Sequence, residues 1–286
     1  MKPAPFEYVR PSSITDALDA LRDGGSGAKA LAGGQSLIPA MNFRLAQPSL
    51  LVDLAGIDGL RGIRPGDDGG LRIGAMTRQR AVERSALVRE RAPLITETMA
   101  WVAHPQIRNR GTIGGSLAHA DPAAELPAVM LALDAVFHLQ GPAGTRRALA
   151  REFYLGLFDT ALKPDELLVE IEVPAAAPDA RFALEEVSRR HGDFALAGVA
   201  VALTPGEDGS VENVAIGLFS VGDRPTLSEA GATVLVGRAL EAGTIAEAAE
   251  ATAEALDPPG DIHATPAYRR HLVRVLTRRA LERLSV

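Results

Sequence analysis

The stretch that decides the fold is Arg110–Leu126, RGTIGGSLAHADPAAEL. Within it, Thr112 and Ile113 precede the pair Gly114-Gly115, Ser116 follows directly, and the acidic Glu125 lies further along. Glycine has no Cβ, so its backbone can lie flat against a ligand and direct N–H groups at a phosphate. The stretch therefore predicts a loop that binds an anionic ligand, followed by a helix from Pro127 to about Leu133.

A second stretch of the same character lies far upstream, at Ala32–Leu37, AGGQSL. It connects an apolar segment to a short helix, and its Gly33-Gly34 pair is followed by Gln35 and Ser36. Two separated glycine turns, each followed by side-chain donors and the start of a helix, indicate a diphosphate held from two sides. Each turn taken alone is also compatible with a tight connection that binds nothing.

The composition describes an ordinary globular chain of 286 residues with a net charge of -6. An acidic chain lacks the basic surface that nucleic acid requires. The absence of cysteine excludes disulfides, cysteine-ligated iron–sulfur clusters and thiolate zinc sites from this chain. We expect a cytoplasmic protein, because neither a signal peptide nor an apolar run long enough to span a bilayer is evident.

Three units of structure are expected along the chain: residues 1–55, 56–175 and 176–286. The first is a β-α-β unit in which Ser13 caps a helix that Gly24-Gly25 ends. In the second we expect a hairpin of Leu60–Ile63 with Leu71–Ile73, and a helix near Gln79 capped by Thr77. The third follows the linker Pro174–Pro178 and reads as a sheet followed by helices. The whole is of the α+β class.

Other chemical signatures are absent from the sequence. No G-x-G-x-x-G follows a strand, and there is no G-x-x-x-x-G-K-[ST] motif. The six histidines have no metal-ligand spacing, so we predict no metal site. No Ser/His/Asp set favours nucleophilic catalysis, and we predict no catalytic residue in this chain.

The last expected helix, Pro266–Leu284, is rich in arginine. A solvated basic face is the default interpretation, and contact with an acidic partner subunit is the alternative. Nucleic acid is disfavoured because no aromatic residues interleave with the basic ones. The arginines are Arg269, Arg270, Arg274, Arg278, Arg279 and Arg283.

Both glycine stretches resemble the paired FAD-binding loops of the medium subunits of molybdenum hydroxylases. The matching segments are AGGQSLIPAMNFRL at 32–45 and QIRNRGTIGGSLAHADPAAELPA at 106–128. The resemblance is to the carbon monoxide dehydrogenase medium-subunit group, which is similar to the FAD domain of xanthine dehydrogenase. It extends over nearly the whole chain, through FEYVRPSS, LVDL, IGAMT, PDELLVEIEVP and VSRRHGDFALAGVAV.

This resemblance implies an FAD-binding fold of the vanillyl-alcohol-oxidase (PCMH) type. It assigns residues 1–55 and 56–175 to two FAD-binding α+β subdomains, and 176–286 to a C-terminal domain with an antiparallel sheet and helices. It also implies a set of residues around the FAD pyrophosphate, its hydroxyl-bearing chain and its ring. That set is Ala32, Gly33, Gly34, Gln35, Ser36, Leu37, Thr112, Ile113, Gly114, Gly115, Ser116, His119, Glu125, Leu168 and Asp193.

The residues depart from the family pattern at three positions. Glu125 stands where relatives usually have Asp, Gln35 where many have His, and Phe194 where some carbon monoxide dehydrogenases have Tyr. A charged turn before a buried strand is the structural alternative for Arg189–Asp193. These departures bear on how each residue contacts a flavin and on which substrate the complex oxidises.

The implied function is that of an FAD-binding electron-transfer subunit in a heterotrimer, and we expect two such heterotrimers to form a dimer. A large subunit would hold the molybdenum cofactor, and a small subunit would hold 2Fe-2S clusters and deliver electrons to FAD. The external acceptor remains open among quinone, cytochrome, NAD and oxygen. Two alternatives remain: a flavin-free assembly subunit of the same complex, and a free-standing flavin oxidase.

Overall fold

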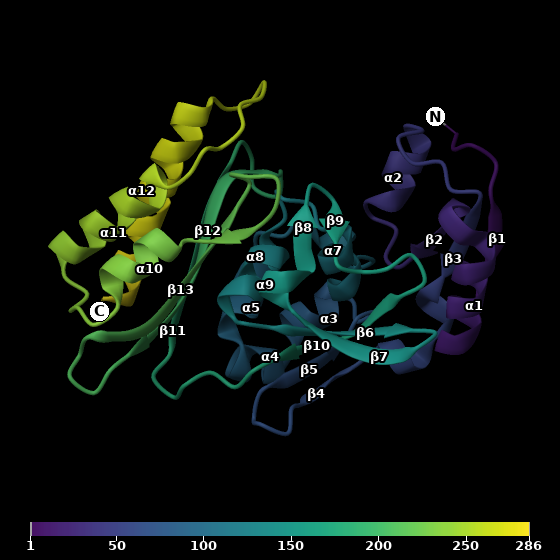
Figure 1. The fold of residues 1–286 in the computed structure, drawn as a ribbon, viewed down its shortest axis with the longest axis horizontal. Coiled ribbons are helices and arrows are strands. Elements are labelled where there is room, and N and C mark those ends of the chain that lie inside the picture. The colour runs from purple at the N-terminus through teal and green to yellow at the C-terminus, as the bar shows by residue number, and fades with distance from the viewer. Residues whose placement is uncertain (1, 286) are drawn as a thin grey trace.

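Three larger sheets occupy successive parts of the chain in the computed structural model, which describes residues 2–285. Figure 1 shows them in a row, with the N-terminal sheet at one end, the second sheet in the middle and the third sheet with its helices at the other end. The site predicted from sequence draws on residues of all three parts.

The first sheet confirms the predicted β-α-β unit. Its strand order is β1-β3-β2, and both pairings are parallel. Ser13 caps the first helix by accepting a hydrogen bond from the N–H of Asp16 at 3.1 Å, and Gly25, with φ of 53°, ends it. The elements are β1 (Glu7–Val9), α1 (Ile14–Gly24), β2 (Ala28–Leu31), α2 (Leu37–Asn42) and β3 (Leu50–Asp53).

The second sheet is antiparallel, with the strand order β4-β5-β10-β6-β7. Its strands are β4 (Ile63–Pro65), β5 (Leu71–Gly74), β6 (Val136–Gly141), β7 (Gly144–Leu149) and β10 (Leu167–Val173). A small separate ladder joins β8 (Tyr154–Gly156) to β9 (Asp159–Thr160). The helices are α3 (Gln79–Arg84), α4 (Ala86–Arg91), α5 (Pro93–Met99), α6 (Pro105–Arg108), α7 (Ile113–His119), α8 (Glu125–Ala132) and α9 (Ala150–Phe153).

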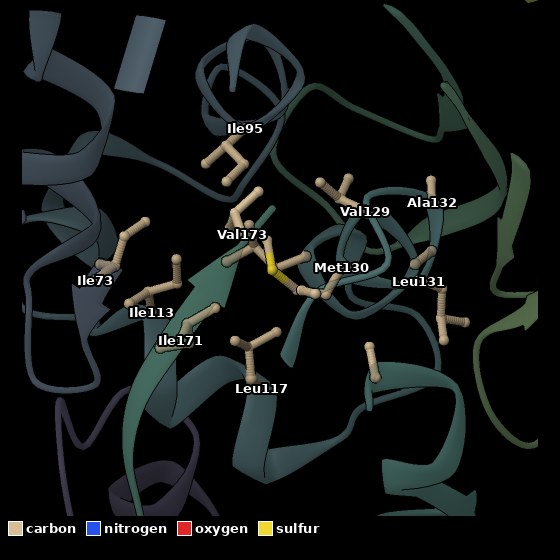
Figure 2. Close-up of a cluster of buried hydrophobic side chains, with 14 of the residues drawn as sticks. Ile73, Ile95, Ile113, Leu117, Val129, Met130, Leu131, Ala132, Ile171 and Val173 are labelled. Atoms are coloured by element: carbon tan, nitrogen blue, oxygen red, sulfur yellow. The ribbon is translucent and has the colours of Figure 1, made fainter. Parts of the chain in front are cut away.

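One buried cluster fixes α7 and α8 against this sheet. Figure 2 shows Ile113 and Leu117 of α7 beside Ile171 of β10, with Met130 of α8 close to Val173. These side chains are fully buried or nearly so, and burying each one stabilises the fold by roughly 1.5–3 kcal/mol. The packing places both ends of α7, and therefore the second glycine stretch, in a fixed position on the sheet.

The third sheet has the order β11-β12-β13-β14 and is antiparallel throughout. One face of this sheet packs against α8, and the other face packs against α10 and α12 (Figure 1). The elements are β11 (Arg181–Ser188), β12 (Ala195–Pro205), β13 (Val211–Phe219), β14 (Thr226–Leu227), α10 (Glu229–Leu235), α11 (Ala242–Glu254) and α12 (Pro266–Leu284).

Two local predictions in the second sheet were wrong. Leu60 is 1% exposed in a short 3₁₀ turn, so the first hairpin strand begins at Ile63 rather than Leu60. Thr77 does not cap α3, whose N-cap is Arg78. The Thr77 hydroxyl instead bonds both the N–H and the carbonyl of Gly62, at 3.0 and 3.1 Å. It therefore ties the start of α3 to the strand-forming segment upstream.

The arginine-rich helix α12 is not simply a solvated basic face. Arg269 is 5% exposed, donates to the carbonyls of Leu196 and Ser220, and pairs with Asp261 at 2.6 Å. Arg283 pairs with Glu97 of α5 at 2.7 Å. These two side chains serve contacts within the chain, and the default interpretation was wrong for them. None of the helices within residues 2–285 is both long and apolar enough to cross a bilayer.

Candidate functional site

The first glycine stretch forms a loop between β2 and α2 whose backbone donors are unused. Across residues 2–285, the N–H groups of Gly33, Gly34, Gln35 and Ser36 donate to no acceptor of the chain. Gly34 has φ of 74°, a conformation that side chains with a Cβ rarely adopt. Consecutive free N–H groups in a turn form a concave donor site for an anion. This loop therefore fits a phosphate group.

The side chains of this loop divide between internal and outward roles. Gln35 donates from Nε2 to the carbonyl of Gly33 at 3.1 Å, which holds the loop closed on itself. Ser36 is exposed and its side chain makes no capping hydrogen bond to α2. Ser36 is thus the side chain of the loop that can face a ligand at little cost to the fold.

The second glycine stretch is the first turn of α7, so the prediction of a loop there was wrong. Thr112 is the N-cap, and its hydroxyl accepts from the N–H of Gly115 at 3.1 Å. The N–H of Ile113 donates to Thr77 at 3.0 Å and that of Gly114 to Ala75 at 2.9 Å. With Ser116 bonded to the carbonyl of Thr112, these four donors are all satisfied within the chain.

The two stretches nevertheless lie against each other. A Cβ on Gly33 would lie 2.6 Å from the carbonyl oxygen of Arg110 and 2.7 Å from Cα of Gly111. A Cβ on Gly115 would lie 3.1 Å from Cβ of Ala32. Close approach between two chain segments therefore requires these glycines whether or not a ligand is bound. Their presence alone does not separate a flavin-binding chain from a flavin-free one.

Glycine is required at position 114 for a separate steric reason. A Cβ there would lie 2.5 Å from Cβ of Ala75 and 2.7 Å from its carbonyl oxygen, in a fully buried environment. α7 can thus sit directly on the end of β5 only with glycine at this position. The chain upstream, through Thr77 and Ala75, supplies the acceptors that make the turn helical.

His119 lies at the far end of α7. Its ring packs against Phe158 with the ring centres 5.0 Å apart. Surrounding groups desolvate the imidazole and lower the pKa of His119 below its ordinary value, although more than a third of the residue is exposed. A neutral, partly exposed imidazole at this position can donate or accept a hydrogen bond.

Glu125 begins α8, two positions before the predicted start at Pro127. It is 7% exposed, and burial raises the pKa of Glu125 to about 7, with a smaller contribution from the charge of Asp121. A carboxyl in this environment is stabilised by hydroxyl donors or by sharing a proton. An acidic residue that only complements the helix dipole in the first turn of α8 would not need such deep burial.

Leu168 and Asp193 are placed differently. Leu168 is 6% exposed, pairs with Leu139 of β6, and belongs to the same buried cluster as Ala195 at the start of β12. Asp193 lies in the half-buried turn before β12, and its N–H donates to Arg190 at 3.0 Å. The strand that holds Leu168 and the strand that follows Asp193 thus both contribute to this buried cluster.

Sequence reasoning passed over one buried carboxyl in this region, Glu186 of β11. It is 7% exposed, and both side-chain oxygens lack a hydrogen-bond partner in the described chain. The signal was available, because Glu186 alternates in phase with the buried Leu184. No group of three or more His, Asp or Glu side chains in residues 2–285 could hold a metal ion.

Comparison with known proteins places this geometry in a class. Residues 4–176 match the family described as "FAD binding domain in molybdopterin dehydrogenase", and residues 182–284 match "CO dehydrogenase flavoprotein C-terminal domain". An α+β fold with two abutting glycine segments and a free donor loop is thus an FAD-binding protein fold.

Individual relatives are similar over their full length. The 6-hydroxypseudooxynicotine dehydrogenase complex subunit alpha of Paenarthrobacter nicotinovorans is 43% identical over 98% of this chain and 95% of its own. The carbon monoxide dehydrogenase medium chain of Afipia carboxidovorans is 44% identical over 99% and 98%. The solved carbon monoxide dehydrogenase of Hydrogenophaga pseudoflava superposes with a TM-score of 0.96 at 40% identity, covering 99% of this chain and 98% of that one.

The chain belongs to the family of FAD-binding medium subunits of molybdenum hydroxylases. This confirms the predicted family, the α+β FAD-binding fold, FAD as its cofactor and the class of oxidoreductase subunit. The role of each site residue remains a prediction that rests on the geometry above.

Proposed function

We propose that the chain is the electron-transfer subunit of a heterotrimeric molybdenum hydroxylase and binds FAD non-covalently. When bound, FAD accepts electrons and passes them to an external acceptor. The single observation that carries the proposal is the loop Gly33–Ser36, whose four backbone donors have no partner among residues 2–285. A pyrophosphate supplies the negative oxygens that such donors bind.

Each part of the site has a proposed task. The loop Gly33–Ser36, flanked by Ala32 and Leu37, holds the pyrophosphate, and the stretch Thr112–Ser116 supports it from behind. His119 and Glu125 lie along the hydroxyl-bearing chain, while Leu168 and Asp193 lie near the ring. The chain binds and orients the cofactor and needs no acid or base toward the primary substrate.

The partners are also part of the proposal. A large subunit with the molybdenum cofactor and a small subunit with 2Fe-2S clusters fit a chain that contains no cysteine. Large apolar side chains remain exposed near α2, among them Phe43 at 66% and Leu45 at 85%, and these support coverage by a partner. We propose a dimer of such heterotrimers in the cytoplasm, with residues 1–55, 56–175 and 176–286 as its structural units.

The flavin-free assembly subunit is the alternative, and a spectrum of the purified chain tests between them. Flavin absorbance, with FAD released by acid at about one per chain, supports the proposal. A colourless chain that takes up no added FAD, even together with its partner subunits, would contradict it. A free-standing oxidase would be reduced by substrate without those partners.

A substitution in the first loop sharpens this test. Ser36→Asp places a negative charge beside the pyrophosphate, whereas Ser36→Asn is of similar size and neutral. Neither removes a hydrogen bond of the fold, since the Ser36 side chain makes no capping bond. We expect Ser36→Asp to weaken FAD binding at least tenfold, about 1.4 kcal/mol, and Ser36→Asn by less than threefold. A bulky residue at Gly115 is a poorer test, because its Cβ would lie 2.6 Å from Thr112 Oγ1 and disturb α7 itself.

A further inference from the structure

Glu186 is a buried carboxyl for which the fold supplies no hydrogen bond of good geometry. Only 7% of the residue is exposed, and neither Oε1 nor Oε2 has a partner within the described residues. Ser188, the nearest hydroxyl along the strand, donates to the carbonyl of Arg190 at 2.9 Å instead. Buried polar groups are normally satisfied, so an orphaned carboxyl points to a donor that belongs to another molecule.

The strand alternation places Glu186 on the side of the third sheet that faces the middle of the molecule. Leu184, on the same face of β11, belongs to the buried cluster that also contains the α8 core. Glu186 pairs in register with Gly198, which pairs with Phe219, so the three form one row across the sheet. Ser220, which directly follows β13, donates its N–H to the carbonyl of Pro122 at 2.7 Å.

That bond attaches the loop before α8 to the edge of the same row, and Glu125 begins α8 directly after this loop. Glu125 and Glu186 consequently face the same buried seam. The charge of Glu125 acts on Glu186 and, after burial, is the second cause that raises the pKa of Glu186, to about 8. Asp121 adds a further negative charge next to Glu125.

Within the residues that the structure describes, no cation is among the groups that shift the pKa of Glu186. Glu97 of α5 is bonded to Arg283 of α12, and Arg283 also pairs with Glu185, on the opposite face of β11. β12 contributes no titratable side chain. The Ser188 hydroxyl lowers the pKa of Glu186 only as the smallest of the three effects. The seam therefore suits neither a phosphate nor any other anion.

A metal ion is also disfavoured, because no three acidic or histidine side chains converge there. Neutral hydroxyl groups remain, since they donate hydrogen bonds to carboxylates without adding charge. In the proposed function, the hydroxyl-bearing ribityl chain of FAD passes Glu125.

We propose that Glu186 is a second flavin-binding carboxyl, which together with Glu125 accepts hydrogen bonds from the ribityl hydroxyls of FAD. The proposal rests on the chain binding FAD. It assigns to Glu186 a positioning role toward the cofactor, with no part in substrate chemistry.

The direction of the pH effect follows from the proton balance. Without FAD, the crowded carboxyls bind a proton at neutral pH. Hydroxyl donors favour the ionised form, so FAD binding lowers the affinity of the pair for that proton. Release of a proton makes the association constant for FAD rise with pH, with a slope equal to the number of protons released.

The experiment measures FAD binding to the full-length chain by titration calorimetry from pH 6 to 8.5, in buffers of different ionisation enthalpy. ADP serves as the control ligand, because it carries the diphosphate but no ribityl chain. For the wild-type chain we expect release of roughly one proton per FAD near pH 7 and of none per ADP. Equal proton release for FAD and ADP would contradict the proposal.

Two substitutions separate binding from folding. Glu186→Gln keeps the shape but cannot ionise, and we expect roughly tenfold weaker FAD binding at pH 8, with at most half of the protons released. Glu186→Leu removes the orphaned carboxyl, so it should stabilise the free chain while weakening FAD binding at every pH. ADP affinity should stay the same in both variants.

The possible outcomes distinguish a failure of the proposed function from a failure of the proposed role of Glu186. A wild-type chain that takes up no FAD at any pH contradicts the proposed function itself. A wild-type chain that binds FAD, with Glu186→Gln unchanged in affinity and in proton count, contradicts only the role of Glu186. If neither variant folds, the difference in proton release between FAD and ADP in the wild-type chain still tests the role of Glu186.

Discussion

The two glycine stretches resemble each other in sequence but differ in the state of their backbone donors. In Gly33–Ser36 none of the four N–H groups has an acceptor in the part of the chain that the structure describes, whereas those of Ile113–Ser116 are bonded to Thr77, Ala75 and Thr112. The first stretch is therefore built to bind a ligand and the second to support the fold beneath it. Similar glycine pairs can thus have opposite physical roles, and hydrogen-bond accounting separates them.

The comparison predicts that substitutions in the second stretch damage the free chain. The largest effect is expected for Gly114→Ala, because the added Cβ would lie 2.5 Å from Cβ of Ala75 with backbone around it. We expect a loss of about 2–4 kcal/mol in the free energy of unfolding, measured by urea denaturation without FAD. Gly243→Ala in α11 is the control, because no atom lies within 4 Å of its Cβ position and stability should not fall. Equal stability of Gly114→Ala and wild type would refute the supporting role.

The second stretch also leads, through α7, to Glu125, and this gives a pH-dependent prediction. The pKa values of Glu125 and Glu186 in the folded chain are raised to about 7 and about 8, above the ordinary value of 4.5. The folded state therefore binds more protons than the unfolded state between these limits, and stability falls as pH rises.

We expect the free chain to lose unfolding free energy between pH 5 and 8.5, at about 1.4 kcal/mol per pH unit for each extra proton that the folded chain binds. Denaturation at each pH measures this, and Glu186→Gln should flatten the curve. A stability that rises with pH over this interval would show that the two carboxyls are not held as the structure places them.

A smaller effect is expected at the cap of α7. Thr112→Ala removes the acceptor of the Gly115 N–H and should cost about 1 kcal/mol in unfolding free energy. Thr112→Ser retains the hydroxyl and should remain within about 0.5 kcal/mol of the wild type. If Ala and Ser variants unfold alike, the capping bond does not stabilise the helix.

Much of the fold could be predicted from the sequence because local patterns and tertiary packing agree there. α12 begins and ends at the predicted residues, Pro266 and Leu284, since its apolar pattern with a period of three to four matches its buried face. α7 could not be predicted, because two adjacent glycines disfavour a helix. Its stability comes from the carbonyls of Ala75 and Thr77, which are distant in sequence.

The position of the candidate site could be predicted from the sequence. Which of the two glycine stretches binds the ligand could not. The order and spacing of the two stretches located the loops, and the structure places them in contact. Which stretch keeps its donors free depends on acceptors from other elements, which no local motif records. The orphaned state of Glu186 likewise depends on Ser188 donating elsewhere.

Backbone amide exchange tests the central claim most directly, because it reads the two sets of N–H groups separately. Hydrogen–deuterium exchange is followed in the FAD-free chain and again with saturating FAD. We predict fast exchange at Gly33–Ser36 that slows strongly when FAD binds, with Ile113–Ser116 already protected and little changed. FAD uptake that protects Ile113–Ser116 while Gly33–Ser36 still exchanges freely would contradict the assignment of the first stretch as the phosphate-binding loop.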